Sequence, residues 1–353
     1  MMRSSSALPL RVLVVDDSVF NRRSIGEILA QSPEIEVVGK AADGEEALRL
    51  VSSLKPDCIT LDLEMPRMDG FTFLRILMTK MPTPVVVVSS YSQKENVFKA
   101  LELGALDFVA KPERFSDPDL GGIREQLVSK VLLARSVRLG SPSARRAADL
   151  SPAPAEPRAQ KQLVPPKGVI AVASSTGGPS ALMEIFTRFP QNYRNAIVIA
   201  QHMPDKFTRT FADRLSRRGA LRVSEAQDQD VVSEGVGFVC PGRHCMELEV
   251  SPRGTMKLKV TPPGERDRDV PSADRLLTSV ASGLGRRAVG VILTGMGDDG
   301  VEGARKIIEA GGIVIAESEE SAVVYGMPGA AVRAGVASQS LPLSEIGDML
   351  AKL

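Results

Sequence analysis

A run of hydroxyl residues and glycines follows an apolar segment in the second half of this 353-residue chain. Residues 169–173 read Val-Ile-Ala-Val-Ala, and residues 174–178 read Ser-Ser-Thr-Gly-Gly. Because Pro179 and a helical pattern come next, a serine hydroxyl would lie at a helix N-terminus, where unpaired N–H groups and the helix dipole favour a developing oxyanion. By itself the motif suits a nucleophile for acyl transfer and a phosphate-binding turn about equally.

A serine nucleophile needs a base, and the chain contains two histidines. His202 follows a predicted strand at 196–200, so it can lie at the same sheet edge as Ser175. His244 lies in a loop after another predicted strand and is the weaker candidate. A single histidine at a strand end is usually structural, so the assignment of His202 as the base depends on a third group that orients its ring.

Two adjacent aspartates are candidates for that group. Asp298 and Asp299 follow a predicted strand at 289–293, in the segment Leu-Thr-Gly-Met-Gly-Asp-Asp-Gly, and the N–H of Met296 in the same turn can bind an oxyanion. A Gly-Asp-Asp-Gly segment alone is more often a turn or a helix cap. The order serine, histidine, aspartate at three strand ends favours a catalytic triad, and the chain lacks both a Gly-x-Ser-x-Gly motif and a Walker lysine.

A second group of polar residues lies in the first half of the chain. Asp16 and Asp17 end its first predicted strand, and Asp62 ends the third. Ser89 ends the fourth predicted strand and Lys111 follows the fifth. Carboxylates gathered in this way suit Mg²⁺, which keeps waters for a phosphate to replace, and the lysine supplies a cation for the same phosphate. Any one of these aspartates is as well explained as a solvated cap, but five suitable residues at strand ends predict a phosphoryl site.

Strand and helix patterns alternate in both halves, which predicts two doubly wound α/β domains. In the first half, predicted strands lie at 11–15, 36–41, 58–61, 84–89 and 106–109, and predicted helices at 19–31, 44–53, 70–81, 95–104 and 120–139. In the second half, predicted strands lie at 169–173, 196–200, 236–240, 289–293 and 313–316, predicted helices at 180–189, 206–217, 272–284 and 301–310, and a β-hairpin at 247–260. Ligand sites in such sheets form beyond the carboxyl ends of the strands.

A proline-rich segment separates the two halves. We predict one domain at 10–130, a linker at 131–167 and a second domain at 168–353. Residues 139–167 contain six prolines and almost no large apolar residue before Leu163, so this part of the linker cannot bury enough surface to offset its ordering entropy.

Composition limits the classes of function. Lys and Arg number 44 against 43 Asp and Glu, so no global charge favours nucleic acid or an anionic membrane. Cys58, Cys240 and Cys245 are too few and too irregularly spaced for a disulfide framework or a metal pair. No signal peptide and no run of membrane-spanning length is found. We therefore expect a cytoplasmic protein that neither inserts into a membrane nor binds nucleic acid.

The first half resembles the flavodoxin-like receiver domain of two-component response regulators. The matching segments are Val-Val-Asp-Asp-Ser at 14–18, Leu-Asp-Leu-Glu-Met-Pro-Arg-Met-Asp-Gly at 61–70 and Val-Ala-Lys-Pro at 109–112. The resemblance implies that a histidine kinase phosphorylates Asp62, that Mg²⁺ binds Asp16, Asp17 and Asp62, and that Ser89 and Lys111 contact the phosphoryl oxygens. It also implies an aromatic switch residue at Phe108, for which a buried core position is an equally good interpretation, and a cis peptide bond between Lys111 and Pro112.

The second half resembles the catalytic domain of the CheB family of chemotaxis protein-glutamate methylesterases. The matching segments are 173–179, 200–204, Cys-Pro-Gly at 240–242 followed by His244, 293–300 and Tyr-Gly-Met-Pro at 325–328. The resemblance implies that Ser175 is the nucleophile, His202 the base and Asp299 the orienting acid, and that Met296 helps to bind the oxyanion.

Two positions depart from the pattern of the family. Ser174 adds a hydroxyl where a residue without one is common, and Asp298 stands where asparagine is frequent.

Together the two resemblances imply a serine hydrolase activated by phosphorylation. Its substrates would be glutamate γ-methyl esters and specific glutamines on chemoreceptor helices, its kinase would be of the CheA type, and the esterase reaction would need no cofactor. The unphosphorylated receiver domain is expected to cover the catalytic sheet edge. The alternatives are a phosphorylation switch without enzymatic activity, which the presence of all three triad residues disfavours, and a DNA-binding regulator, which the second α/β half disfavours.

Overall fold

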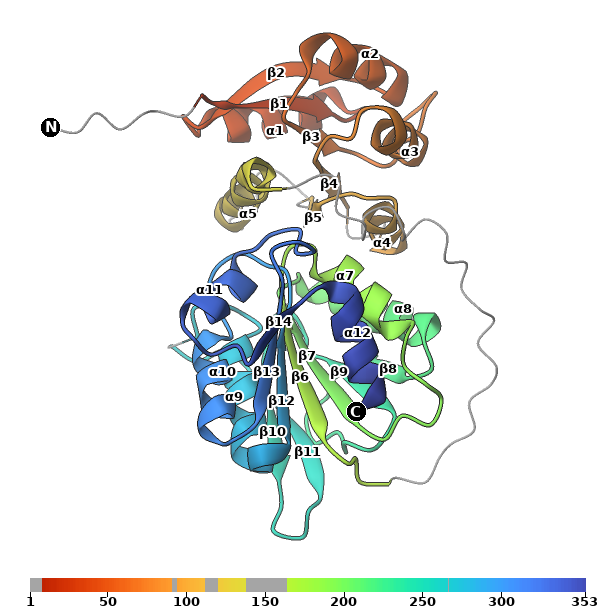
Figure 1. Cartoon of the computed structure of the whole chain (residues 1–353). Helices are drawn as coiled ribbons and strands as arrows, with labels where there is room; N and C mark the ends of the chain where they lie inside the picture. Colours follow the sequence, from red (N-terminus) through yellow and green to blue (C-terminus); the bar gives the residue numbers. More distant parts are fainter. Residues whose placement is uncertain (1–7, 91–93, 112–119, 138–163, 266) are drawn as a thin grey trace, which may run out of the picture. The chain divides into compact units, whose positions relative to one another are not determined.

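The computed structural model describes residues 8–90, 94–111, 120–137, 164–265 and 267–353 (Figure 1). The chain divides into two compact units, residues 1–140 and 141–353. Each unit contains its own parallel sheet, so the prediction of two doubly wound α/β domains is confirmed. Among the described helices, none is long and apolar enough to cross a membrane.

The first unit is a five-stranded parallel sheet in the order β2-β1-β3-β4-β5. Its strands are β1 (Leu10–Val15), β2 (Ile35–Ala41), β3 (Cys58–Leu61), β4 (Val85–Ser89) and β5 (Asp107–Ala110). Its helices are α1 (Val19–Ala30), α2 (Gly44–Leu54), α3 (Gly70–Lys80), α4 (Lys94–Glu102) and α5 (Leu120–Leu132), and a short 3₁₀ turn, η2 (Leu133–Arg135), follows α5. The last residues of α5 and the 3₁₀ turn therefore fall inside the predicted linker.

Local sequence explains the elements of this unit. Every residue of β3, β4 and β5 is buried, as expected for strands of a parallel sheet that helices cover on both faces. The side chains of Ser18, Asp43 and Asp69 accept N–H groups at the start of α1, α2 and α3, which satisfies donors that have no partner within the helix. These caps fix where each helix begins after the loop that carries the polar residues of the sheet edge.

The second unit is a seven-stranded parallel sheet in the order β14-β13-β12-β6-β7-β9-β8, joined by the antiparallel hairpin β10-β11. Its strands are β6 (Val169–Ser174), β7 (Ala196–Gln201), β8 (Arg222–Glu225), β9 (Val236–Val239), β10 (Cys245–Val250), β11 (Met256–Thr261), β12 (Ala288–Ile292), β13 (Ile313–Glu317) and β14 (Gln339–Leu341). Its helices are α7 (Gly178–Phe186), α8 (Asp205–Arg218), α9 (Ala273–Leu284), α10 (Val301–Glu309), α11 (Met327–Arg333) and α12 (Leu343–Lys352), and the 3₁₀ turn η4 (Gly285–Arg287) lies between α9 and β12.

Helices cover both faces of this sheet, with α9, α10 and α11 on one side and α7, α8 and α12 on the other (Figure 1). Alternate residues of β6 and β7 pack into a buried apolar cluster together with side chains of α9, α10, α11 and the hairpin. The central strands are therefore shielded from water, and their carboxyl ends are fixed relative to one another.

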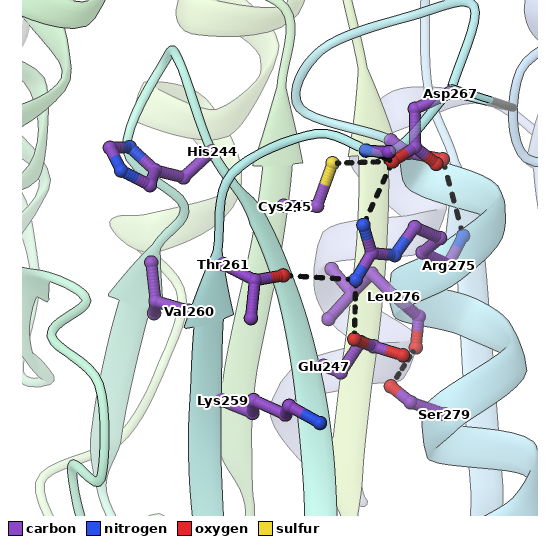
Figure 2. Close-up of polar contacts among 12 residues, drawn as sticks. His244, Cys245, Glu247, Lys259, Val260, Thr261, Asp267, Arg275, Leu276 and Ser279 are labelled. Atoms are coloured by element: carbon purple, nitrogen blue, oxygen red, sulfur yellow. Dashed lines mark hydrogen bonds and ion pairs between the residues drawn. The ribbon is translucent and has the colours of Figure 1, made fainter.

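The hairpin packs against α9 through Arg275. Figure 2 shows its guanidinium between Asp267, Glu247 and the hydroxyl of Thr261. Its N–H groups donate to Asp267 at 2.8 Å, to Glu247 at 2.5 Å and to Oγ1 of Thr261 at 3.0 Å. Burial alone would lower the pKa of Arg275, but the carboxylates of Glu247 and Asp267 outweigh burial, so the pKa is raised. Arg275 thus joins the start of α9 to both strands of the hairpin.

Candidate active site

The carboxyl ends of three neighbouring strands form the candidate site. In the sheet order, β6 lies between β7 and β12, so the chain leaves β6 in one direction and later returns to its other side. Such a reversal opens a crevice beyond the strand ends, where α/β proteins bind ligands. Ser175 follows β6, His202 follows β7 and Asp299 lies in the loop after β12, so all three predicted triad residues belong to this edge.

Ser175 lies in a tight turn between β6 and α7. Its N–H donates to Thr294 O at 3.1 Å, and its carbonyl accepts the N–H of Gly178 at 2.9 Å. Gly177 precedes α7 with a φ of 81°, a left-handed conformation that favours glycine. A Cβ on Gly295 would lie 2.8 Å from the Cβ of Ser175, so only glycine lets the two turns approach this closely. The serine side chain is half-buried, unlike that of its neighbour Ser174.

Ser174 is buried and has a different set of contacts. Its hydroxyl donates to Oε1 of Gln201 at 2.6 Å, and Nε2 of Gln201 donates to the carbonyls of Ser175 at 2.9 Å and His202 at 3.0 Å. The extra hydroxyl of Ser174 therefore ties the ends of β6 and β7 together. Sequence reasoning assigned no role to Gln201, although a polar residue at the end of an otherwise apolar strand is a usable signal.

His202 and Asp299 form a direct pair. Nε2 of His202 lies 2.8 Å from Oδ2 of Asp299. The same carboxylate accepts two backbone N–H groups from the start of α9, Ala273 at 2.8 Å and Asp274 at 3.0 Å. Since an ionised carboxylate accepts the Nε2 proton, Nδ1 is the ring nitrogen left to accept a proton from a nucleophile. Asp299 is 6% exposed, whereas Asp298 is exposed, so the geometry distinguishes the two adjacent aspartates.

The turn after β12 connects these groups. The hydroxyl of Thr294 donates to Thr176 O at 2.9 Å and accepts the N–H of Val324 at 2.9 Å. The carbonyl of Gly295 accepts the N–H of Met327 at 2.8 Å. Met296 is half exposed, and within the described residues its N–H donates no hydrogen bond. That N–H is therefore free to bind a ligand oxygen.

A buried glutamate beneath this turn was not foreseen. Oε2 of Glu317 accepts the N–H of Thr294 at 2.8 Å, and Oε1 accepts the hydroxyl of Ser321 at 2.9 Å. Burial raises the pKa of Glu317 to about 7, although these two hydrogen bonds oppose the shift. The side chain is 1% exposed, so an ionisable group that can be neutral near pH 7 holds the turn that leads to Met296.

The contacts of His244 differ from those of the predicted triad residues. It follows β9, its N–H donates to Pro241 O at 3.0 Å, and Figure 2 shows its imidazole pointing away from Arg275. Its ring forms no hydrogen bond within the described part of the chain. The structure thus pairs His202, and not His244, with a carboxylate.

The cysteines do not provide an alternative nucleophile. All three are buried and unpaired. Burial raises the pKa of each thiol, to about 12 for Cys58, which keeps it protonated and unreactive.

The first unit brings its predicted phosphoryl-site residues together. Carboxylate oxygens of Asp16, Asp17 and Asp62 lie within 4.8 Å of one another, and this set of oxygen donors fits Mg²⁺. Nζ of Lys111 lies 2.8 Å from Asp16 and 2.5 Å from Asp62. Burial raises the pKa of Asp62 despite the nearby lysine, and burial of Lys111 is outweighed by the two carboxylates, so its pKa is also raised. Ser89 is buried at the end of β4.

Two further expectations for this unit have different outcomes. Phe108 is buried in β5 and contacts the ring of Phe98 edge to face, with centroids 6.3 Å apart, so in this structure it is a core residue. The peptide bond between Lys111 and Pro112 lies outside the described residues.

Comparisons with known proteins agree with both units. A family model described as response regulator receiver domain matches residues 12–118, and one described as CheB methylesterase matches residues 170–350. A Myxococcus xanthus protein named protein-glutamate methylesterase/protein-glutamine glutaminase 1 is 47% identical over 99% of this chain and 98% of its own length. A Pyrococcus abyssi protein with the same enzyme name is 40% identical over 97% of this chain and 93% of its own.

A solved structure extends the comparison to three dimensions. The crystal structure of the Thermotoga maritima CheB methylesterase catalytic domain is 36% identical, with a TM-score of 0.51, and the match covers 52% of this chain and 97% of that one. The two relatives match this chain over nearly their whole length, and the solved structure matches the fold of its second unit. The chain belongs to the CheB methylesterase family, with a response regulator receiver domain preceding the catalytic domain.

Proposed function

We propose that this protein hydrolyses glutamate γ-methyl esters on chemoreceptor proteins, releases methanol, and deamidates specific receptor glutamines by the same chemistry. One observation carries the proposal: a half-buried serine at a helix N-terminus shares its sheet edge with a histidine paired to a buried carboxylate at 2.8 Å. The names of the relatives give the class of substrate. We expect the protein to act in the cytoplasm, without inserting into a membrane or binding nucleic acid.

The reaction begins at Ser175. Nδ1 of His202 takes the hydroxyl proton while the serine oxygen attacks the γ-carbonyl carbon of the substrate. The resulting imidazolium faces Asp299, which stabilises its charge and keeps the ring in one orientation. The histidine then gives the proton to the leaving methoxy group, methanol departs, and an acyl-enzyme remains.

Water resolves the acyl-enzyme. Nδ1 of His202 removes a proton from the water, the hydroxide oxygen adds to the acyl carbon, and Ser175 leaves with a proton, which yields a free glutamate side chain. With a glutamine substrate, the first step expels ammonia instead of methanol. Negative charge on the carbonyl oxygen is stabilised by the free N–H of Met296 and by the N-terminus of α7.

The receiver domain supplies the regulation. Asp62 accepts a phosphoryl group from a CheA-type histidine kinase, and Asp16, Asp17 and Asp62 hold the Mg²⁺ that this transfer needs. When bound, the ion neutralises negative charge on the phosphoryl oxygens. Lys111 and Ser89 contact the same oxygens, and phosphorylation activates the esterase.

Methanol release from methylated receptor in membrane vesicles tests the catalytic assignments. Ser175→Ala and His202→Gln are expected to lower kcat by about 10⁴- to 10⁶-fold, and Asp299→Asn by about 10⁴-fold. Ser174→Ala is the matched control: it removes the neighbouring hydroxyl, which donates to Gln201, and is expected to lower kcat by no more than about tenfold. A Ser175→Ala protein that still releases methanol at the rate of the unaltered chain would exclude this function.

A further inference from the structure

The first turns of α9 and α10 exchange hydrogen bonds through two aspartates. Asp299, just before α10, accepts the N–H groups of Ala273 and Asp274 at the start of α9, at 2.8 Å and 3.0 Å. In return, Oδ1 of Asp274 accepts the N–H groups of Gly300 at 3.0 Å and Gly303 at 2.8 Å. Each helix N-terminus, where N–H groups lack partners within the helix, is therefore capped by an aspartate from the other.

The two helices are too close for this arrangement to adjust freely. A Cβ on Gly303 would lie 2.6 Å from the Cβ of Leu277 and 2.8 Å from the carbonyl oxygen of Asp274. Gly300 has a φ of 99°, a conformation that residues with side chains rarely adopt. Backbone contacts on both sides thus limit the positions that the turn at 298–300 can take.

The same turn carries the carboxylate that faces the histidine. Oδ2 of Asp299 is shared between the N–H of Ala273 and Nε2 of His202, so its position depends on how α10 sits against α9. We propose that Asp274 is a positioning residue for the esterase reaction, because its carboxylate fixes the turn that presents Asp299 to His202. This inference rests on the proposed roles of His202 and Asp299.

Charges around Asp274 agree with a role at the site. Burial raises the pKa of Asp274, the N–H of Gly303 opposes that shift, and the charges of Asp299 and Glu302 add to it. A second carboxylate next to Asp299 also strengthens the negative potential at the imidazolium that forms during catalysis. Length and charge can therefore be tested separately at this position.

Helix α9 offers a matched control on its other side. Oγ of Ser279 accepts the N–H of Leu248 in the hairpin at 2.8 Å and donates to Leu276 O at 2.7 Å; Figure 2 shows it on the same helix as Arg275. Like Asp274, it accepts a backbone N–H from another element. No hydrogen bond joins Ser279 to Asp299 or to α10 among the described residues.

The experiment compares four variants of the full chain in methanol release. For each variant, kcat and KM are measured from about pH 5 to about pH 9 at intervals of about half a pH unit. Asp274→Ala is expected to lower kcat about 10- to 100-fold with little change in KM, and to move the low-pH limb of the kcat profile to lower pH. Asp274→Asn keeps an oxygen acceptor and is expected to retain kcat within about threefold. Asp274→Glu keeps the charge on a side chain that is one methylene longer, and its kcat is expected to fall about tenfold. Ser279→Ala is expected to lose stability but to keep kcat and the pH profile within about twofold.

Circular dichroism at the assay temperature verifies that each variant is folded. If Asp274→Ala does not fold, the kcat of Asp274→Glu is compared with that of Asp274→Asn, and this comparison tests the positioning role. The inference is overturned if neither the alanine nor the glutamate variant lowers kcat by more than about twofold, or if Ser279→Ala loses as much activity as they do. An Asp299→Asn protein with full activity would instead overturn the proposed function, whatever the Asp274 variants do.

Discussion

Replacing Glu317 by glutamine should change how the stability of the second unit depends on pH. Glu317 is 1% exposed, and burial raises its pKa from 4.5 to about 7. In the folded protein the carboxyl therefore keeps its proton between those values, while in the unfolded chain it releases it. The stabilisation from proton binding is complete below about pH 4.5 and is lost as the pH rises through about 7. At 1.36 kcal/mol per pKa unit, the loss is about 3 kcal/mol.

Glutamine removes this titration but keeps the fold of the site. Its oxygen can accept the N–H of Thr294, and its amide can donate to the hydroxyl oxygen of Ser321. Any cost of rearranging these bonds is the same at every pH. The free energy of unfolding of Glu317→Gln relative to the unaltered chain should therefore rise by about 3 kcal/mol between about pH 4 and about pH 8.

Tyrosine fluorescence can follow this unit alone. The chain has no tryptophan and three tyrosines, of which Tyr193 and Tyr325 belong to the second unit. In a Tyr91→Phe background, urea titrations of both proteins at each pH give the two unfolding free energies. Glu309→Gln is the control, since that glutamate is exposed and its variant should give a difference independent of pH. A pH-independent difference for Glu317→Gln as well would refute the reasoning.

Three other substitutions or treatments give clear expectations. Gly295→Ala places a methyl group 2.8 Å from the Cβ of Ser175 and should lower kcat for methanol release by about 10- to 100-fold, whereas Gly254→Ala, in an open hairpin turn, should change only stability. Asp62→Asn should abolish the stimulation of receptor demethylation by a small phosphodonor while leaving the basal rate, and an unchanged stimulation would exclude Asp62 as the acceptor. Chelation of Mg²⁺ should remove the same stimulation without reducing the basal methanol release, because the mechanism proposed above assigns the esterase steps to Ser175, His202 and Asp299.

The fold was largely predictable from local sequence. Buried Val- and Ile-rich segments such as 169–173 alternate with amphipathic helices, and this pattern specifies a parallel sheet covered on both faces. The hairpin was also predicted, because Ser-Pro-Arg-Gly at 251–254 supplies a turn in which Gly254 takes a φ of 81°. The edge strands β8 and β14 and the last two helices were not predicted. Those strands are short and partly exposed, so they lack the continuous apolar signal of the central ones.

The candidate site was predictable only in part, for a physical reason. Residues that follow buried strands must gather at one edge of a parallel sheet, so strand ends indicated that the serines after 169–173, His202 and the two aspartates 298 and 299 are neighbours. The resemblance to the family then selected Ser175 and Asp299. Their catalytic roles stay predictions. Asp274 and Glu317 were missed because the hydrogen bonds that define them join elements far apart in sequence. Neither hydrophobic periodicity nor a short motif indicates from which N–H group a buried carboxylate will accept a hydrogen bond.

These carboxylates share a property that bears on regulation. Asp299, Asp274 and Glu317 are each held by backbone N–H groups, which cannot rotate away as side-chain donors can. A site built in this way has its polar groups in place before the substrate arrives, so little reorganisation is needed during the reaction. Because backbone N–H groups already fix the carboxylate of Asp299 beside His202, this pair does not need phosphorylation in order to assemble. We therefore expect Asp62 to control whether a receptor helix reaches Ser175, rather than how well Ser175 reacts.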